Sequence, residues 1–297
     1  MSKKHKSLKL RLRKNLGGWM FLLPWFTLFV IFSAYPFVYG IAISFYDHNY
    51  KEMSFIGLEN YARIFQDDLF KIAVSATLKM ASLIIVGTLC FSLWTAFVLQ
   101  GWTRKTQALG KLAFYLPSIV SQVALVIVWK WIFNPAFGIS ASVASMLGIP
   151  PINWFGDVSL AIPLIAILVM SFNVSQPIII FSAAINGIPE DLYEASEIDG
   201  ATRGKQFWRI TLPLLRPTLA FVTVTTTIAS LQVFVVLYML TGGGPQYGTT
   251  SILLLVYRNA FEYSRYGYAS ALGVVLFLII SIIAAIQFRL NQRDIQY

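Results

Sequence analysis

Six long, mostly apolar stretches of this sequence carry no charged residue, and they limit what the chain can fold into. They are Asn15–Tyr46, Met80–Thr103, Leu112–Trp129, Val158–Pro189, Pro217–Tyr257 and Tyr266–Phe288. A helix needs about 20 apolar residues to cross the hydrocarbon core of a bilayer, so each stretch can hold one spanning helix. A single soluble core does not need six such stretches. We therefore predict an all-α integral membrane protein with six transmembrane helices in a lipid bilayer.

The sequence predicts one membrane domain at residues 17–289 between two short tails, 1–16 and 290–297. The longest stretch is interrupted at Thr241–Pro245, and the residues after it, 246–257, are too short to cross. We interpret 246–257 as an external or partly re-entrant segment. Pro117, Pro163 and Pro177 lie inside spans and predict kinks. The spans are expected at residues 17–45, 73–100, 112–133, 159–186, 216–240 and 267–289.

The charge distribution predicts the orientation of the chain. The net charge is +10, and most of the 23 lysine and arginine residues fall on one side if both termini are cytoplasmic. This agrees with the positive-inside rule, so the basic tail is an orientation signal and no nucleic acid is expected as a partner. The first apolar stretch is too long for a cleavable signal peptide, and we expect it to be retained. Cys90 is expected to be a small apolar packer in the second span.

The residues needed for enzyme chemistry are missing from the sequence. His5 and His48 are the only histidines, and no metal-ligand spacing or Ser/His/Asp set can be assembled. The segment Gly200–Gln206 has the wrong spacing for a phosphate-binding loop. No acidic residue lies inside a predicted span, which argues against an ion-coupled carrier, although backbone carbonyls can also bind sodium. We therefore expect no metal, cofactor or catalytic residue in this chain, and an external energy source.

A polar loop at residues 187–214 is the most charged part of the chain between two spans. Pro189 and the acidic residues after it suit the first turn of a helix, and Gly200 is a natural helix stop. Leu192, Ala195 and Ile198 would form a short apolar stripe. A second helix at about 202–211 would lead to the fifth span. Periodicity alone leaves two interpretations open: a docking site for a soluble partner, or a helix pair that only caps the bundle.

The motif in this loop resembles the EAA loop of binding-protein-dependent ABC importers. Glu-Ala-small, a glycine four residues later and Ile-x-Leu-Pro stand at the family's spacing, with serine in place of the second alanine. The resemblance implies a type I ABC importer permease fold in a bacterial or archaeal cell membrane. It also implies coupling to ATPase subunits through this loop, at Glu194, Ala195, Ser196, Gly200, Ile210, Leu212 and Pro213.

A second resemblance narrows the family. Leu240–Pro245 with Thr249 and Thr250 is similar to the segment after the fifth core span of MalF-like carbohydrate-uptake permeases. The family implies a second homologous permease subunit and two cytoplasmic ATPase subunits that bind ATP and Mg. It further implies an extracytoplasmic solute-binding protein and a sugar substrate. Glycerol-phosphate or a polyol derivative is the alternative substrate, and an ion-coupled sugar carrier and a membrane-embedded enzyme are the alternative classes.

Polar residues inside the spans are the candidates for sugar binding, because amides and hydroxyls recognise sugars by hydrogen bonds. The same side chains could instead join neighbouring helices, and the share held by the second permease is open. The candidates in the fourth and fifth spans are Asn173, Gln176, Ser230, Gln232 and Tyr238.

Overall fold

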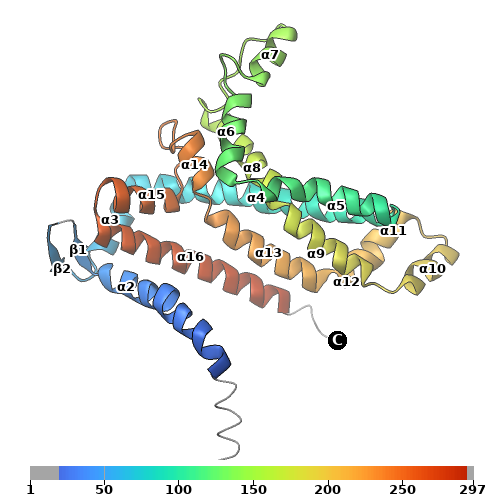
Figure 1. Cartoon of the computed structure of the whole chain (residues 1–297), viewed down its shortest axis with the longest axis horizontal. Coiled ribbons are helices and arrows are strands. Elements are labelled where there is room, and N and C mark those ends of the chain that lie inside the picture. The colour runs from blue at the N-terminus through green and yellow to red at the C-terminus, as the bar shows by residue number, and fades with distance from the viewer. Residues whose placement is uncertain (1–19, 50, 293–297) are drawn as a thin grey trace, which may run out of the picture.

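The computed structural model describes residues 20–49 and 51–292, and the chain within these ranges is mostly helical (Figure 1). Four helices are long and apolar enough to cross a membrane: Met20–Ile43, Asp68–Gln100 (α4), Arg216–Leu240 and Tyr266–Leu290. Two helix pairs pass the same test only together. They are α5 (Arg104–Ile119) with α6 (Gln122–Ile132), bent by 93°, and α8 (Val158–Asn173) with α9 (Ser175–Asn186), bent by 54°. The described residues thus hold four to six candidate spans.

The predicted tail 1–16 lies outside the described residues, as do residues 293–297 of the C-terminal tail. Between these limits, the other elements are segments of the long helices or short connecting elements. The first helix includes η1 (Val30–Ala34) and α2 (Tyr35–Ile43), and the last described helix is α16 (Tyr266–Gln292). The others are β1 (Tyr46–His48), β2 (Met53–Phe55), α3 (Glu59–Gln66), α7 (Ile139–Met146), α10 (Glu190–Ile198), α11 (Arg203–Gln206), η2 (Phe207–Thr211), α12 (Leu212–Leu214), α13 (Arg216–Leu231), α14 (Val235–Leu240), α15 (Ile252–Tyr257) and η3 (Arg258–Glu262).

Two predicted helix starts differ from the structure. The second span was expected to begin at residue 73, but α4 begins at Asp68, after Asp67 accepts a hydrogen bond from the Leu69 N–H at 2.9 Å. The third was expected at residue 112, but α5 begins at Arg104 after the N-cap Thr103. Hydropathy marks where a helix enters hydrocarbon, whereas capping side chains mark where the helix itself begins.

The third and fourth predicted spans are bent, not straight. Pro177 has no N–H to donate to the carbonyl of Asn173, and its ring crowds that carbonyl. The helix accordingly breaks at Val174, between α8 and α9. The break between α5 and α6 follows Pro117 by a few residues, where Val120 and Ser121 have ψ values of 143° and 129°. The predicted kinks at Pro117 and Pro177 are therefore associated with real helix breaks.

Helix α4 is the centre of the bundle and packs against α8, α9, α13 and α15. Three apolar clusters meet along it. Met80 and Ile84 belong to the cluster with α8 and α14, Ala73 to the cluster with α15 and α16, and Ala96 to the cluster with α9 and α13. Cys90, which was expected to be a small apolar packer in the second span, lies on α4 with its side chain exposed.

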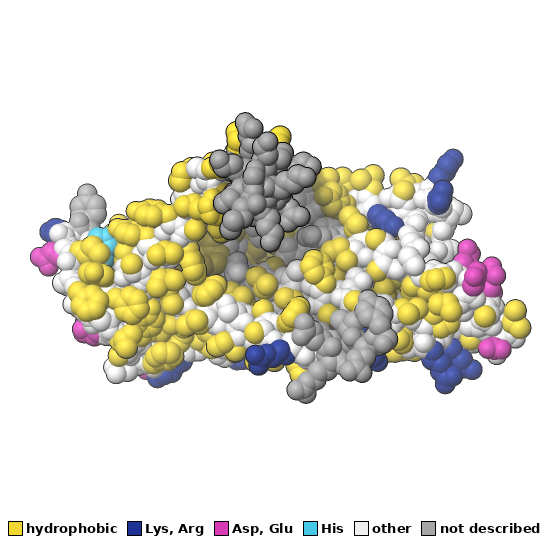
Figure 2. Space-filling model, turned by 90° about the horizontal axis from the view of Figure 1, so that it is seen from below, with side chains coloured by type: hydrophobic (Ala, Val, Ile, Leu, Met, Phe, Trp, Pro, Cys, Tyr) yellow, Lys and Arg dark blue, Asp and Glu magenta, His cyan; other side chains and the backbone are white. Residues whose placement is uncertain are grey.

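A two-stranded antiparallel sheet follows the first helix and is a departure from the predicted all-α chain. Strands β1 and β2 pair Tyr46 with Phe55 and His48 with Met53. The sheet, with α3, covers one end of the bundle, which we call the hairpin end (Figure 1). The opposite end, where α10 lies, is called the α10 end. Figure 2 shows a broad apolar surface between two ends at which most of the charged side chains gather.

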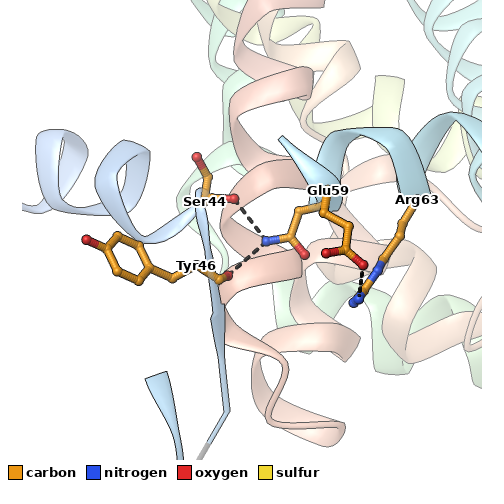
Figure 3. A network of polar contacts seen from close by, with 5 residues as sticks. Ser44, Tyr46, Glu59 and Arg63 are labelled. Atoms are coloured by element: carbon orange, nitrogen blue, oxygen red, sulfur yellow. Dashed lines mark hydrogen bonds and ion pairs between the residues drawn. The ribbon is translucent and has the colours of Figure 1, made fainter. Parts of the chain in front are cut away.

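Asn60 fixes the path of the chain at the hairpin end, where Figure 3 shows Ser44 and Tyr46 bonded to one side-chain amide, which is that of Asn60. Its side-chain amide is buried and donates hydrogen bonds to the carbonyl oxygens of Ser44 and Tyr46, both at 2.9 Å. These carbonyls lie where the first helix passes into β1, so they have no helical partner. Neighbouring Glu59 and Arg63 form an ion pair at 2.6 Å, but it is half exposed and contributes little to stability.

We expect Asn60→Ala to lower the stability of the hairpin end by about 2–3 kcal/mol, because two buried carbonyls lose their donor. The measurement is the apparent melting temperature of the detergent-purified protein. Asn49→Ala is the matched control, since Asn49 is exposed and accepts from the Lys51 and Glu52 N–H groups. Equal melting temperatures for both variants would show that the Asn60 amide does not hold this turn.

Candidate functional site

The polar loop folds as two helices joined at a glycine. Helix α10 starts after Pro189 and stops at Ile198, and Gly200 has a φ of +71°. The Gly200 N–H donates to the Glu197 carbonyl at 3.0 Å, and the Ala201 N–H donates to the Ser196 carbonyl at 2.9 Å. These two bonds form a Schellman motif, in which glycine takes the left-handed position. The prediction that Gly200 ends the first helix is confirmed.

The second helix of the loop is longer than expected, because α11, η2 and α12 follow one another without interruption from Arg203 to Leu214. Thr202 caps its start by accepting a hydrogen bond from the Lys205 N–H. Of the predicted coupling residues on this helix, Ile210 and Leu212 are half-buried and Pro213 is exposed. Leu215 follows and is 1% exposed in the α4–α9–α13 cluster. The helix thus runs directly into the bundle.

The apolar stripe of α10 does not face the bundle. No residue of α10 is buried, and the side chains of Leu192 and Ile198 are 44% and 88% exposed. Glu194 and Ala195 are exposed as well, and Ser196 is half-buried. In Figure 1, α10 lies at the outer edge of the molecule, beyond the end of α4. A helix pair that only capped the bundle would bury this stripe, so the geometry favours a partner.

Three helix breaks line a cavity of about 1130 Å³ that is open to the surface, where Ser118, Gln176 and Gln232 are exposed. One wall comes from the α5–α6 break at Val120, a second from the α8–α9 break next to Asn173, and a third from the interruption between α13 and α14 at Gln232–Phe234. Discontinuous membrane helices build substrate sites in many transporters, because their unpaired backbone groups face a cavity and not lipid. The volume exceeds the usual range for small-molecule pockets.

The cavity is lined by neutral polar and aromatic side chains. Among the described residues that line it, none is charged. Amides, hydroxyls and aromatic rings stand between apolar side chains, which is the combination that binds the hydroxyl groups and apolar faces of neutral polar molecules. The polar and aromatic lining residues are Tyr115, Ser118, Gln122, Phe172, Asn173, Ser175, Gln176, Gln232 and Phe234.

The structure brings together some of the predicted substrate residues and separates others. Asn173, Gln176 and Gln232 line the cavity from two of its walls. Ser230 does not line it, since its hydroxyl is buried and donates to the Thr226 carbonyl at 2.7 Å within α13. Tyr238 also lies outside the lining, and its ring stacks on Phe234 with centroids 5.6 Å apart. Sugar binding by any of the five stays a prediction.

The third predicted span contributes lining residues that sequence reasoning missed, among them Tyr115, Ser118 and Gln122. Their signal in the sequence is Pro117, a helix breaker that lies between them. Without a neighbouring helix to compare, hydropathy does not show which face of a span meets a cavity. Ser175 was passed over beside Asn173 and Gln176, although it also lines the cavity.

The interruption between α13 and α14, at residues 232–234, is stabilised by a hydrogen bond from the residue that precedes α15. Ser251 Oγ donates to the Val233 carbonyl at 3.1 Å and accepts from the Leu254 N–H, so the start of α15 is fixed against the break. The glycine-rich loop between α14 and α15 is held by hydroxyls. Thr249 and Thr250, both fully buried, donate to the carbonyls of Gly244 and Gly243 at 2.6 and 3.1 Å.

Comparison with protein families finds one matching model. Residues 89–296 match the family described as binding-protein-dependent transport system inner membrane component. The match begins inside α4 and includes both the cavity and the polar loop, so the two features belong to the part of the chain that the family shares.

Similar proteins align with nearly the whole chain. The multiple sugar-binding transport system permease protein MsmF of Streptococcus mutans is 32% identical, over 93% of this chain and 95% of that protein. The trehalose/maltose transport system permease protein MalF of Thermococcus litoralis is 33% identical, over 92% of each. Among solved structures, a chain of a bacterial ABC transporter that imports the acidic polysaccharide alginate has a TM-score of 0.88 at 23% identity, covering 98% of this chain and 100% of that one.

Proposed function

Because this chain belongs to the binding-protein-dependent transport system inner membrane components, we propose that it is the permease subunit through which an ATP-driven importer moves a sugar or oligosaccharide. The observation that carries the substrate class is the uncharged cavity of amides, hydroxyls and aromatic rings where three helix breaks meet. A phosphorylated polyol would favour basic side chains in that lining. The cavity therefore supports a neutral sugar over glycerol-phosphate.

The proposal includes six spans, with each bent pair crossing once, and both termini in the cytoplasm of a bacterial or archaeal cell. The positive-inside rule supports this orientation, which puts the α10 end inside and the hairpin end outside. Lys105 and Arg203 lie at the α10 end, near the cytoplasmic leaflet in this orientation. Pro117 and Pro177, next to the breaks, explain how one span can change direction inside the bilayer.

The partners in the proposal are a second homologous permease, two ATPase subunits and an extracytoplasmic binding protein. The exposed stripe of α10 supports docking on the ATPase, because neighbouring exposed apolar side chains, here Leu192 and Ile198, are typical of surfaces that bind a partner. ATP and Mg would bind to the ATPase subunits, and this chain would be a translocation subunit without catalytic residues. A second solved chain, of the alginate transporter with its substrate-bound periplasmic protein, also has this fold, with a TM-score of 0.85.

Purification through an affinity tag on this chain from its native membrane tests the proposal. We expect a second permease and an ATPase to co-purify and to hydrolyse ATP. Reconstituted vesicles with the binding protein should take up a labelled sugar from a panel that includes maltose and trehalose. Recovery of the chain alone, or uptake driven by an ion gradient without ATP, would refute the importer.

Variants of the cavity test the substrate path. We expect Asn173→Leu and Gln232→Leu each to raise the KM for sugar uptake roughly 5-fold, since each loses a hydrogen bond worth about 1 kcal/mol. The double variant should raise the KM for sugar uptake roughly 30-fold, while the complex still assembles normally. Ser230→Ala is the control, because Ser230 lies outside the lining. An unchanged KM in the double variant would remove both amides from the path.

A further inference from the structure

Side-chain hydrogen bonds join the two helices of the polar loop at two places, through Gln206 and through Thr211, and the Gln206 amide also donates to the Tyr193 carbonyl at 3.4 Å. Ser196 Oγ of α10 accepts a hydrogen bond from the Gln206 amide at 2.9 Å and donates to the Tyr193 carbonyl at 2.7 Å. One turn away, the Tyr193 hydroxyl lies 2.9 Å from Thr211 Oγ1. The contacts are ten and eighteen residues apart along the chain, so they close the glycine-containing bend at two separate points.

The second helix supplies the buried half of each contact. Gln206 is 6% exposed and Thr211 is fully buried, whereas α10 has no buried residue. A buried polar side chain that loses its partner leaves an unsatisfied group, so these contacts resist separation. Helix α10 thus has little apolar packing to hold it, and the two contacts fix its angle to the second helix.

The second helix in turn rests on α4 as well as on α13. The rings of Phe207 and Phe97, on α4, have centroids 4.8 Å apart. At the end of α4, a Cβ added to Gly101 would lie 2.9 Å from Arg203 Nη1, so the guanidinium packs directly on the Gly101 backbone. Leu215 then enters the cluster that contains Ala96 of α4. A movement of the second helix must therefore move the α10 end of α4.

We propose that the Ser196–Gln206 and Tyr193–Thr211 contacts form a clamp that makes α10 and the second helix move as one lever, which drives α4 together with α13. The four side chains are positioning residues. The inference rests on the proposed function, in which an ATPase moves α10. It gives a physical role to Ser196, the position at which the loop departs from its motif: an alanine there has no hydroxyl for Gln206.

The test follows motion from the ATPase to the cavity and needs no knowledge of the sugar. In the complex purified through this chain, Cys90→Ala removes the only cysteine of this chain and Ser118→Cys places a reporter in the cavity lining, so labelling is measured on the separated band of this chain. The rate of labelling by an impermeant maleimide is compared without nucleotide and after Mg-ATP with vanadate. With the clamp intact, we expect the rate to change at least 10-fold.

The variant Tyr193→Phe/Gln206→Leu removes both contacts. We expect its labelling rate to change less than 2-fold, while the amount of vanadate-trapped nucleotide stays normal. Tyr263→Phe/Gln66→Leu is the matched control, because both of its side chains are exposed and lie towards the hairpin end. Single variants guard against misfolding: Ser196→Ala should reduce the response about 3-fold, and Ser196→Thr, which keeps a hydroxyl, should restore it.

A full 10-fold response in Tyr193→Phe/Gln206→Leu, or equal responses of Ser196→Ala and Ser196→Thr, would overturn the clamp. A different result marks failure of the proposed function itself. If no ATPase co-purifies, or if vanadate changes labelling in no form of the protein, the importer assembly is refuted and the clamp with it.

Discussion

Gly200→Pro is expected to reduce transport at least 30-fold while the protein still inserts and assembles. Gly200 has a φ of +71°, and proline is restricted to about −65°, so the bend between the two loop helices cannot keep its shape. Proline also removes the N–H that donates to the Glu197 carbonyl. Helix α10 would then point away from the second helix, and ATP hydrolysis would no longer drive uptake. The measurement is the ratio of sugar transported to ATP hydrolysed in reconstituted vesicles.

Two further substitutions at this position separate backbone strain from steric effects. No atom lies within 4 Å of a Cβ added at Gly200, so alanine fits in space but meets a strain of about 1–2 kcal/mol in the left-handed region. Asparagine tolerates that region better. We expect uptake to fall in the order glycine, asparagine, alanine, proline. Equal uptake by all four would show that the bend plays no part in coupling.

Gly267→Ala is expected to prevent stable folding of the hairpin end. A Cβ at Gly267 would lie 1.9 Å from the Tyr46 carbonyl oxygen and 3.0 Å from the His48 nitrogen, and both are backbone atoms of β1. The start of α16 can approach the strand only without a side chain, so the strand, the helix or both must shift. A clash of this kind costs well above the 1–3 kcal/mol typical of moderate overpacking.

Gly273→Ala is the control on the same helix, because a Cβ there meets nothing within 4 Å. Alanine is a better helix former than glycine by about 1 kcal/mol, so this variant should be as stable as the parent or more so. Monodisperse yield and melting temperature in detergent distinguish the two. Similar behaviour of both variants would mean that α16 does not pack on β1 in the folded protein.

The membrane class and the approximate place of most spans could be predicted because they depend on local composition. Charge-free stretches mark the segments that can cross the hydrocarbon core of a bilayer. The helix Tyr266–Leu290, for example, lies close to the predicted span 267–289. The hairpin could not be predicted in this way. β1 and β2 have three residues each, which is too short for a clear pattern. The strands lie against α16, which is more than 200 residues further along the chain, and β1 is held by the side chain of Asn60.

Some features of the candidate site could be predicted from the sequence, and others could not. Gly200 was identifiable because glycine at a helix end has a local physical reason. The partner of Ser196 was not, since Gln206 reaches it only when the bend folds back. In the same way, Gln232 and Ser230 looked equivalent as polar residues in one span. In the structure, Gln232 lines the cavity, whereas the Ser230 hydroxyl donates to the Thr226 carbonyl within its own helix.

The sequence by itself determined that this protein has several membrane-spanning helices, the family to which it belongs and the position of its charged loop. These follow from runs of apolar residues and from fixed spacings, which do not depend on how helices pack. Tertiary structure decided where the helices break, which side chains face one cavity and how the loop is attached to α4. Each of these depends on contacts between residues far apart in the chain, and such contacts exist only once the helices have packed together.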